Sequence, residues 1–175
     1  MCYNYIIEKE IKVGHKFSMS DFVIGKEKAM EEVLNYIDKL KNLFEENSTV
    51  RARLYFNRGG CYKFACLLQK HFPQGEIAVT RDLLHVVFKF QNKFYDVDGE
   101  FLKTNEIIAV GAEIPNTVLK ILQSYDFDFD KYAPKQNYFK VYDEFSYDEQ
   151  EEFYDFCMNY NCIDTLNELE WREVK

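Results

Sequence analysis

The sequence of 175 residues is poor in glycine and proline, with seven and three residues respectively. This scarcity excludes collagen-like and low-complexity chains. No apolar run approaches the roughly 20 residues that cross a bilayer. The opening segment, MCYNYIIEKEIK, carries acidic residues where a signal peptide would be basic. Hydrophobic residues make up 47% of the chain and charged residues 30%, so we expect a globular, cytoplasmic protein with no membrane partner.

A basic surface is also missing. The net charge is −8, and the acidity lies in residues 126–175, which hold 14 acidic and five basic residues. Aromatic residues alternate with the acids in YDFDFDKY at 125–132 and in VYDEFSYDEQEEFYDF at 141–156. This pattern disfavours nucleic-acid binding. It is compatible either with solvated helix faces or with a surface that binds a basic protein partner.

The five cysteines do not form a metal-binding or disulfide motif. None has CxxC spacing, and the two closer pairs, 61/66 and 157/162, are each five residues apart. On a continuous helix, side chains five apart point in different directions, so neither pair is predicted to bind a metal or to form a disulfide. We therefore expect free thiols, no metal and no cofactor.

Hydrophobic periodicity predicts an α+β domain: a small antiparallel sheet packed against a helix that bears a cysteine, with N-terminal and C-terminal helices. The expected domain covers 1–175, with a catalytic core at 57–100 and an acidic helical part at 126–175. We predict helices at 26–46, 61–72, 115–124, 146–160 and 164–171. We predict strands at 3–13, 50–56, 76–80, 84–90, 93–98 and 107–110.

Cys61 stands at a chemically distinctive position, because it directly follows Gly59 and Gly60 and opens a predicted helix. Unpaired N–H groups and the positive end of the helix dipole stabilise an anion there, and a thiolate is such an anion. The glycines allow a substrate to approach the backbone, and Gly60 and Asn57 are the candidate oxyanion or substrate-binding groups.

A histidine and two acids are predicted to share one face of the following ribbon. With a two-residue loop at 91–92, His85 pairs with Asp98, and Val87 pairs with Asp96. A helix-start thiol, an imidazole and an orienting carboxylate are the parts of a cysteine hydrolase. From the residues alone, either Asp96 or Asp98 could be the orienting acid.

The stretches GGCYKFACLL at 59–68 and LHVVFKFQNKFYDVDGE at 84–100 resemble the core of the papain-like and transglutaminase-like cysteine hydrolases, in a small bacterial or phage-type form. This resemblance covers roughly 57–100. It implies that Cys61 is the nucleophile and His85 the base, with Asp96 or Asp98 as the acid. The sequence departs from the family pattern in the short interval between Cys61 and His85 and in the lack of an evident upstream glutamine.

Two functions follow. The first is a cysteine hydrolase that acts on an amide-type bond of a protein or peptide, as a peptidase, isopeptidase or deamidase. The alternative is a non-enzymatic acidic protein that binds a basic protein partner through its C-terminal part, with Cys61 and His85 in the core.

Overall fold

The computed structural model describes residues 19–128, 133–135, 138–162 and 164–165. The chain divides into two compact units, Met1–Val33 and Leu34–Lys175. The first helix, α2 (Met19–Glu46), crosses this boundary and begins before the predicted residue 26. The expectation of one domain over 1–175 stays a prediction. No helix among the described residues is long and apolar enough to cross a membrane.

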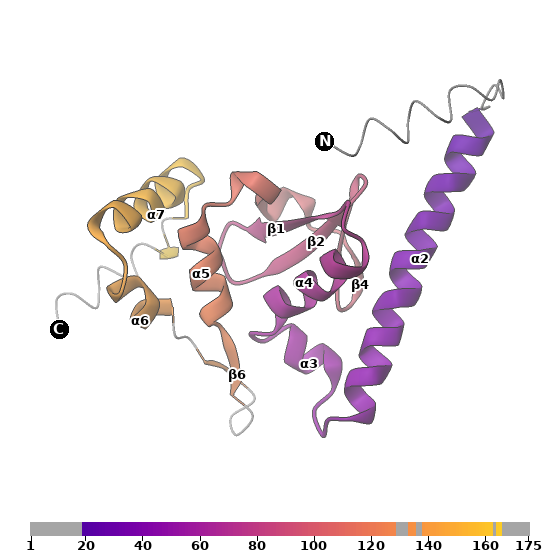
Figure 1. Cartoon of the computed structure of the whole chain (residues 1–175), viewed down its shortest axis with the longest axis horizontal. Coiled ribbons are helices and arrows are strands. Elements are labelled where there is room, and N and C mark those ends of the chain that lie inside the picture. The colour runs from indigo at the N-terminus through magenta and orange to yellow at the C-terminus, as the bar shows by residue number, and fades with distance from the viewer. Residues whose placement is uncertain (1–18, 129–132, 136–137, 163, 166–175) are drawn as a thin grey trace. The chain divides into compact units, whose positions relative to one another are not determined.

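The second unit is built on an antiparallel sheet of five strands in the order β4-β3-β2-β1-β5. Strands β1, β2 and β4 of this sheet are labelled in Figure 1. The strands are β1 (Glu76–Thr80), β2 (Val86–Phe90), β3 (Lys93–Asp96), β4 (Gly99–Phe101) and β5 (Ile107–Val110). In β2, side chains on both faces are buried, and only Lys89 is partly exposed. Both faces of the central strand are therefore covered, and the predicted α+β class is confirmed.

The helix that opens at Cys61, α4 (Cys61–His71), packs against β1, β2 and β3. Its buried side chains follow helical spacing and are Cys61, Phe64, Ala65 and Leu68. Gly75, at the turn from α4 into β1, allows a close approach, because a Cβ there would lie 2.1 Å from the Phe88 ring. Helix and sheet are thus closely packed where α4 leads into β1.

The strand predicted at 50–56 is wrong. Ala52–Phe56 forms a short helix, α3, in which Ala52 and Phe56 are buried one turn apart. The Phe56 ring contacts the rings of Phe44 and Phe64. Tertiary packing of these aromatic side chains overrides the β propensity of the segment VRARLYF.

The strand predicted at 93–98 is also wrong at its end. β3 stops at Asp96, which pairs with Gly99 of β4, so Val97 and Asp98 form a tight turn. Gly99 has φ of 110°, a left-handed conformation that favours glycine. The loop before β3 has the expected length, because Phe90 pairs with Lys93 across Gln91 and Asn92.

The C-terminal part contains three described helices, α5 (Asn116–Ser124), α6 (Tyr138–Asp143) and α7 (Tyr147–Asn159), of which α5 packs against the other two. The predicted capping box of α7 is present: Glu149 N donates to Ser146 Oγ, and Ser146 N donates to the Glu149 carboxylate. A two-stranded ribbon, β6 (Asp126–Asp128) with β7 (Ala133–Lys135), was not predicted. The segment 3–13 and most of 164–171 lie outside the described residues.

Candidate active site

Cys61 is the first residue of α4, and only 3% of its surface is exposed. The helix begins there because Gly60 O accepts from Phe64 N, which leaves the earlier N–H groups without an intrahelical carbonyl. The thiol donates to the carbonyl of Leu84, with 3.9 Å between sulfur and oxygen. The sulfur therefore lies against the loop that joins β1 to β2.

That loop positions His85. Its N–H donates to Thr80 Oγ1 at 3.2 Å, and its carbonyl accepts from Thr80 N at 3.1 Å. Asp82 Oδ1 accepts from Leu84 N at 3.0 Å and lies 2.6 Å from Thr80 Oγ1. The buried Tyr125 hydroxyl donates to the carbonyl of Leu83, which has a positive φ of 53°. His85 thus stands just before β2, one residue ahead of the strand.

Three of the predicted site residues, Cys61, His85 and Asp96, interact. His85 Nε2 lies 3.0 Å from Asp96 Oδ2, and both side chains are largely buried. Burial lowers the pKa of His85, but hydrogen bonds with Asp96 and with Cys61 outweigh it and raise the pKa to about 9. Because Nε2 is bonded to Asp96, Nδ1 is the ring nitrogen left for the sulfur. The result is a continuous chain of hydrogen-bonding groups, Cys61–His85–Asp96.

The pairing of His85 with Asp98 is a prediction that the structure corrects. β3 ends at Asp96, so Asp98 stands in the turn, where its side chain binds α3 instead. Arg53 Nε lies 2.5 Å from Asp98 Oδ1, and Asn57 Nδ2 donates to Asp98 Oδ2 at 3.0 Å. Asp98 N donates to Asp96 Oδ1 at 2.8 Å. Asp98 therefore supports the carboxylate that binds His85.

Both groups expected to bind an oxyanion already have partners. Asn57 is bonded to Asp98, and Gly60 N donates to the carbonyl of Tyr55 at 3.2 Å. Glycine is required at 60 for packing, because a Cβ would lie 2.7 Å from the Tyr55 ring. Gly59 adopts φ of 108°, so the Gly-Gly pair shapes the turn into α4.

Sequence reasoning missed two groups of this site. The Leu84 carbonyl carries no sequence signal, because it is a backbone group whose position depends on the loop. Arg53 lies on the segment that was interpreted as a strand. A strand at this position did not predict a contact with Asp98, which lies 45 residues further along the chain. The helical spacing of the apolar residues Ala52 and Phe56 was the available signal.

Fold and site together define an α+β protein in which a histidine is hydrogen-bonded to an aspartate and interacts with a cysteine at the start of a helix. The chain belongs to the family described as Phage YunG-like protein, whose model matches residues 36–140. The matched range includes α4, the whole five-stranded sheet and the three site residues. No curated protein and no solved structure matches the sequence.

Proposed function

We propose that this protein is a papain-like cysteine hydrolase that cleaves an amide-type bond of a protein or peptide, with Cys61 as nucleophile. The observation that carries the proposal is the position of His85, which is hydrogen-bonded to Asp96 and whose pKa is raised by interaction with both Asp96 and Cys61. A nucleophile, a base within reach of it and a third group that orients the base are what covalent catalysis requires. The resemblance of 59–68 and 84–100 to papain-like hydrolases supports the same function.

In the first half of the reaction, His85 and Cys61 act as an imidazolium and a thiolate. The raised pKa of His85 keeps the ring protonated at neutral pH. The Cys61 sulfur attacks the carbonyl carbon, and the carbonyl oxygen becomes an oxyanion. The Cys61 N–H at the helix start is the donor we assign to it. His85 then transfers its proton to the leaving amine, and the C–N bond breaks to give a thioester.

In the second half, water attacks the thioester carbonyl while neutral His85 accepts its proton. The C–S bond breaks, the acid is released, and the Cys61 thiolate and His85 imidazolium are restored. Asp96 holds Nε2 throughout, so the remaining ring nitrogen stays directed at the sulfur. An amine in place of water would give acyl transfer at the same site.

The test uses an activated ester, because the natural substrate is not needed to observe the thioester. p-Nitrophenyl acetate should give a burst of nitrophenol, and the acetyl group should appear on the tryptic peptide 59–63. Cys61→Ser should abolish the burst, whereas Cys66→Ser, a matched thiol one helical turn away, should retain it. Acetylation of other residues without acetylation of Cys61 would contradict the proposal.

One observation favours the alternative, an acidic protein that binds a basic partner. On α7 the large side chains of Tyr147, Tyr154 and Met158 are 79%, 44% and 50% exposed and share one helix face. Exposed acidic residues on the same helix include Asp148, Glu151 and Asp155. Binding of a synthetic lysine-leucine helical peptide, measured by calorimetry, should be lost in Met158→Lys protein and kept in Cys61→Ser protein. Equal binding by both variants would contradict this alternative.

A further inference from the structure

The C-terminal end of α7 brings two cysteines together that sequence spacing had separated. Asn161 has φ of 57°, Cys162 N donates to Cys157 O at 2.7 Å, and Asn161 N donates to Met158 O at 3.3 Å. These two bonds around a left-handed residue are a Schellman motif, in which the side chains of the first and last residues are frequently in contact, and here the two thiols interact. Those residues are Cys157 and Cys162, so the expectation that their side chains point apart is wrong: α7 does not continue through 162.

The two thiols are buried and unequal. Cys157 is 0% exposed and Cys162 2%, and both are free thiols. Interaction with Cys157 lowers the pKa of Cys162 and the charge of Arg81 also lowers it, whereas burial and the charge of Asp82 raise it. Interaction with Cys162 and burial both raise the pKa of Cys157. We assign Cys162 as the sulfur that reacts first, because it lines a cavity together with Arg81 and Cys157 does not, and Cys157 as the thiol that supports it.

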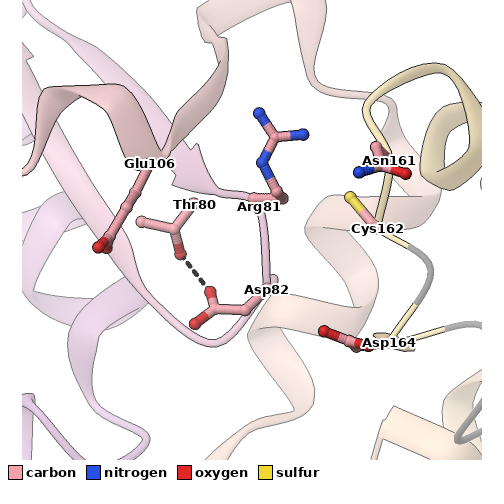
Figure 2. Close-up of a pocket in the computed structure, with 7 residues that line it drawn as sticks. All are labelled: Thr80, Arg81, Asp82, Glu106, Asn161, Cys162 and Asp164. Carbon is pink, nitrogen blue, oxygen red and sulfur yellow. Dashed lines mark hydrogen bonds between the residues drawn. The ribbon is translucent and has the colours of Figure 1, made fainter.

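Cys162 also borders a cavity. A pocket of about 170 Å³ is lined by Cys162 and by polar residues of three chain segments, Thr80, Arg81, Asp82, Glu106, Asn161 and Asp164 (Figure 2). Arg81 Nη1 donates to Tyr160 O at 2.6 Å, which fixes the Arg81 side chain beside the end of α7. A volume of this size admits a small oxidant, although the thiol itself is nearly covered.

We propose that Cys157 and Cys162 form a redox site that a hydroperoxide closes to a disulfide. The Cys162 thiolate attacks an oxygen of hydrogen peroxide, the O–O bond breaks, and with one proton a sulfenic acid and water form. The Cys157 sulfur then attacks Cys162, the S–S bond forms, and a second water leaves. The dithiol loses two electrons and two protons, the peroxide is reduced to two waters, and an added dithiol reductant reverses the change. This site is separate from Cys61.

The full-length protein provides its own controls. After limiting hydrogen peroxide at neutral pH, acid quenching, alkylation and trypsin, both cysteines lie in one peptide, 141–172, which has no internal Lys or Arg. We expect this peptide to lose two hydrogen atoms and its alkyl groups, and to recover them after reduction. Cys66, in peptide 64–70, should stay alkylated. Oxidation of Cys66 while 141–172 keeps both alkyl groups would overturn the proposal.

Variants distinguish the role of Cys162, which reacts with peroxide, from that of Cys157, which closes the disulfide. In Cys157→Ser protein the sulfenic acid should persist on Cys162 and be trapped by dimedone, whereas Cys162→Ser protein should not be trapped at Cys157. Arg81→Gln should slow oxidation roughly several-fold, because it removes the positive charge near the thiolate. Cys61→Ser should leave the rate unchanged. If a serine variant does not fold, the oxidation of peptide 141–172 in the wild-type protein is the deciding result. Dimedone trapping at Cys157 instead of Cys162 would contradict the proposal that Cys162 is oxidised first.

Discussion

His85 is the residue on which the proposed chemistry depends, because it is the link between the thiol and the carboxylate. Burial alone would lower its pKa below 6.5 and leave a neutral ring. The hydrogen bonds with Asp96 and Cys61 reverse this and raise the pKa to about 9. At neutral pH the ring is then a proton donor, as the departing amine requires.

NMR titration measures this value directly, since the chain has only three histidines. We expect the His85 ring signals to titrate with a midpoint near 9 in wild-type protein. Asp96→Asn should lower the midpoint, because it removes the carboxylate that stabilises the imidazolium. Asp98→Asn is the matched control and should lower it less. A wild-type midpoint at or below 6.5 would be incompatible with the proposed ion pair.

Asp96 and Asp98 are separated by one residue and differ in role. Asp96 contacts the imidazole, whereas Asp98 contacts Arg53 and Asn57 and holds Asp96 through its backbone N–H. Asp96→Asn should therefore lower turnover of the activated ester by roughly a hundredfold. Asp98→Asn should lower this turnover less, because the substitution keeps the backbone N–H that donates to Asp96. The opposite ranking, or no effect of either, would argue against Asp96 as the orienting acid.

Sequence reasoning found Cys61, His85 and Asp96 because each lies on an element with a clear pattern or beside a turn of known length. It could not choose between Asp96 and Asp98, because the choice depends on where β3 ends. That end is set by the tight turn before Gly99, which the alternating pattern of KFYDVD conceals.

At the scale of elements, errors arose where tertiary packing decides the structure. Residues 52–56 are helical because Phe56 packs between Phe44 and Phe64, and the local sequence alone favours a strand. The end of α7 is another example. Asn161 is a residue that tolerates the left-handed conformation, and it was the available signal that the helix ends before Cys162.

The junction of α3 and α4 gives a test at this scale. Gly60→Ala should lower the free energy of unfolding by roughly 1–3 kcal/mol, because the new Cβ would overlap the Tyr55 ring. Urea titration measures the change. In a Tyr55→Leu background, Gly60→Ala should lower the free energy of unfolding by less, because the aromatic ring is absent. An equal cost in both backgrounds would exclude the Tyr55 ring as the cause.

At the scale of the whole molecule, the order of helices and strands was enough to predict the α+β class. A change of hydrophobic period from helical to alternating after Gly75 marks the sheet, and Pro115 and the capping box at Ser146 mark the starts of two of the helices that follow it. The small ribbon β6–β7 was not predicted because the alternation in YDFDFDKY was interpreted as a charged surface and not as a strand. The helix α6 has six residues, too few to show a helical period.

The raised pKa of His85 also makes global stability depend on pH. Its folded value of about 9 exceeds the unfolded value of 6.5, so the stabilisation is complete below pH 6.5 and is lost as the pH rises through 9. The loss is at most about 3 kcal/mol. Urea unfolding should show a decrease in this window that His85→Gln removes. A decrease of the same size in the variant would assign it to other groups.

The central claim is that His85 activates Cys61, and selective alkylation tests it most directly. Cys61 is 3% exposed whereas Cys66 is only half-buried, so access alone predicts faster labelling of Cys66. Burial also raises the pKa of Cys66. In Cys2→Ser protein, limiting iodoacetamide at about pH 6.5 should nevertheless label Cys61 first. The two thiols lie in separate tryptic peptides, 59–63 and 64–70.

His85→Ala should abolish this preference, because it removes the partner of the thiolate. We predict that peptide 59–63 is alkylated well before peptide 64–70 in the protein that retains His85, and that the order reverses in the His85→Ala variant. Faster labelling of Cys66 in both proteins, or a Cys61 preference that survives the loss of His85, would contradict the proposed activation.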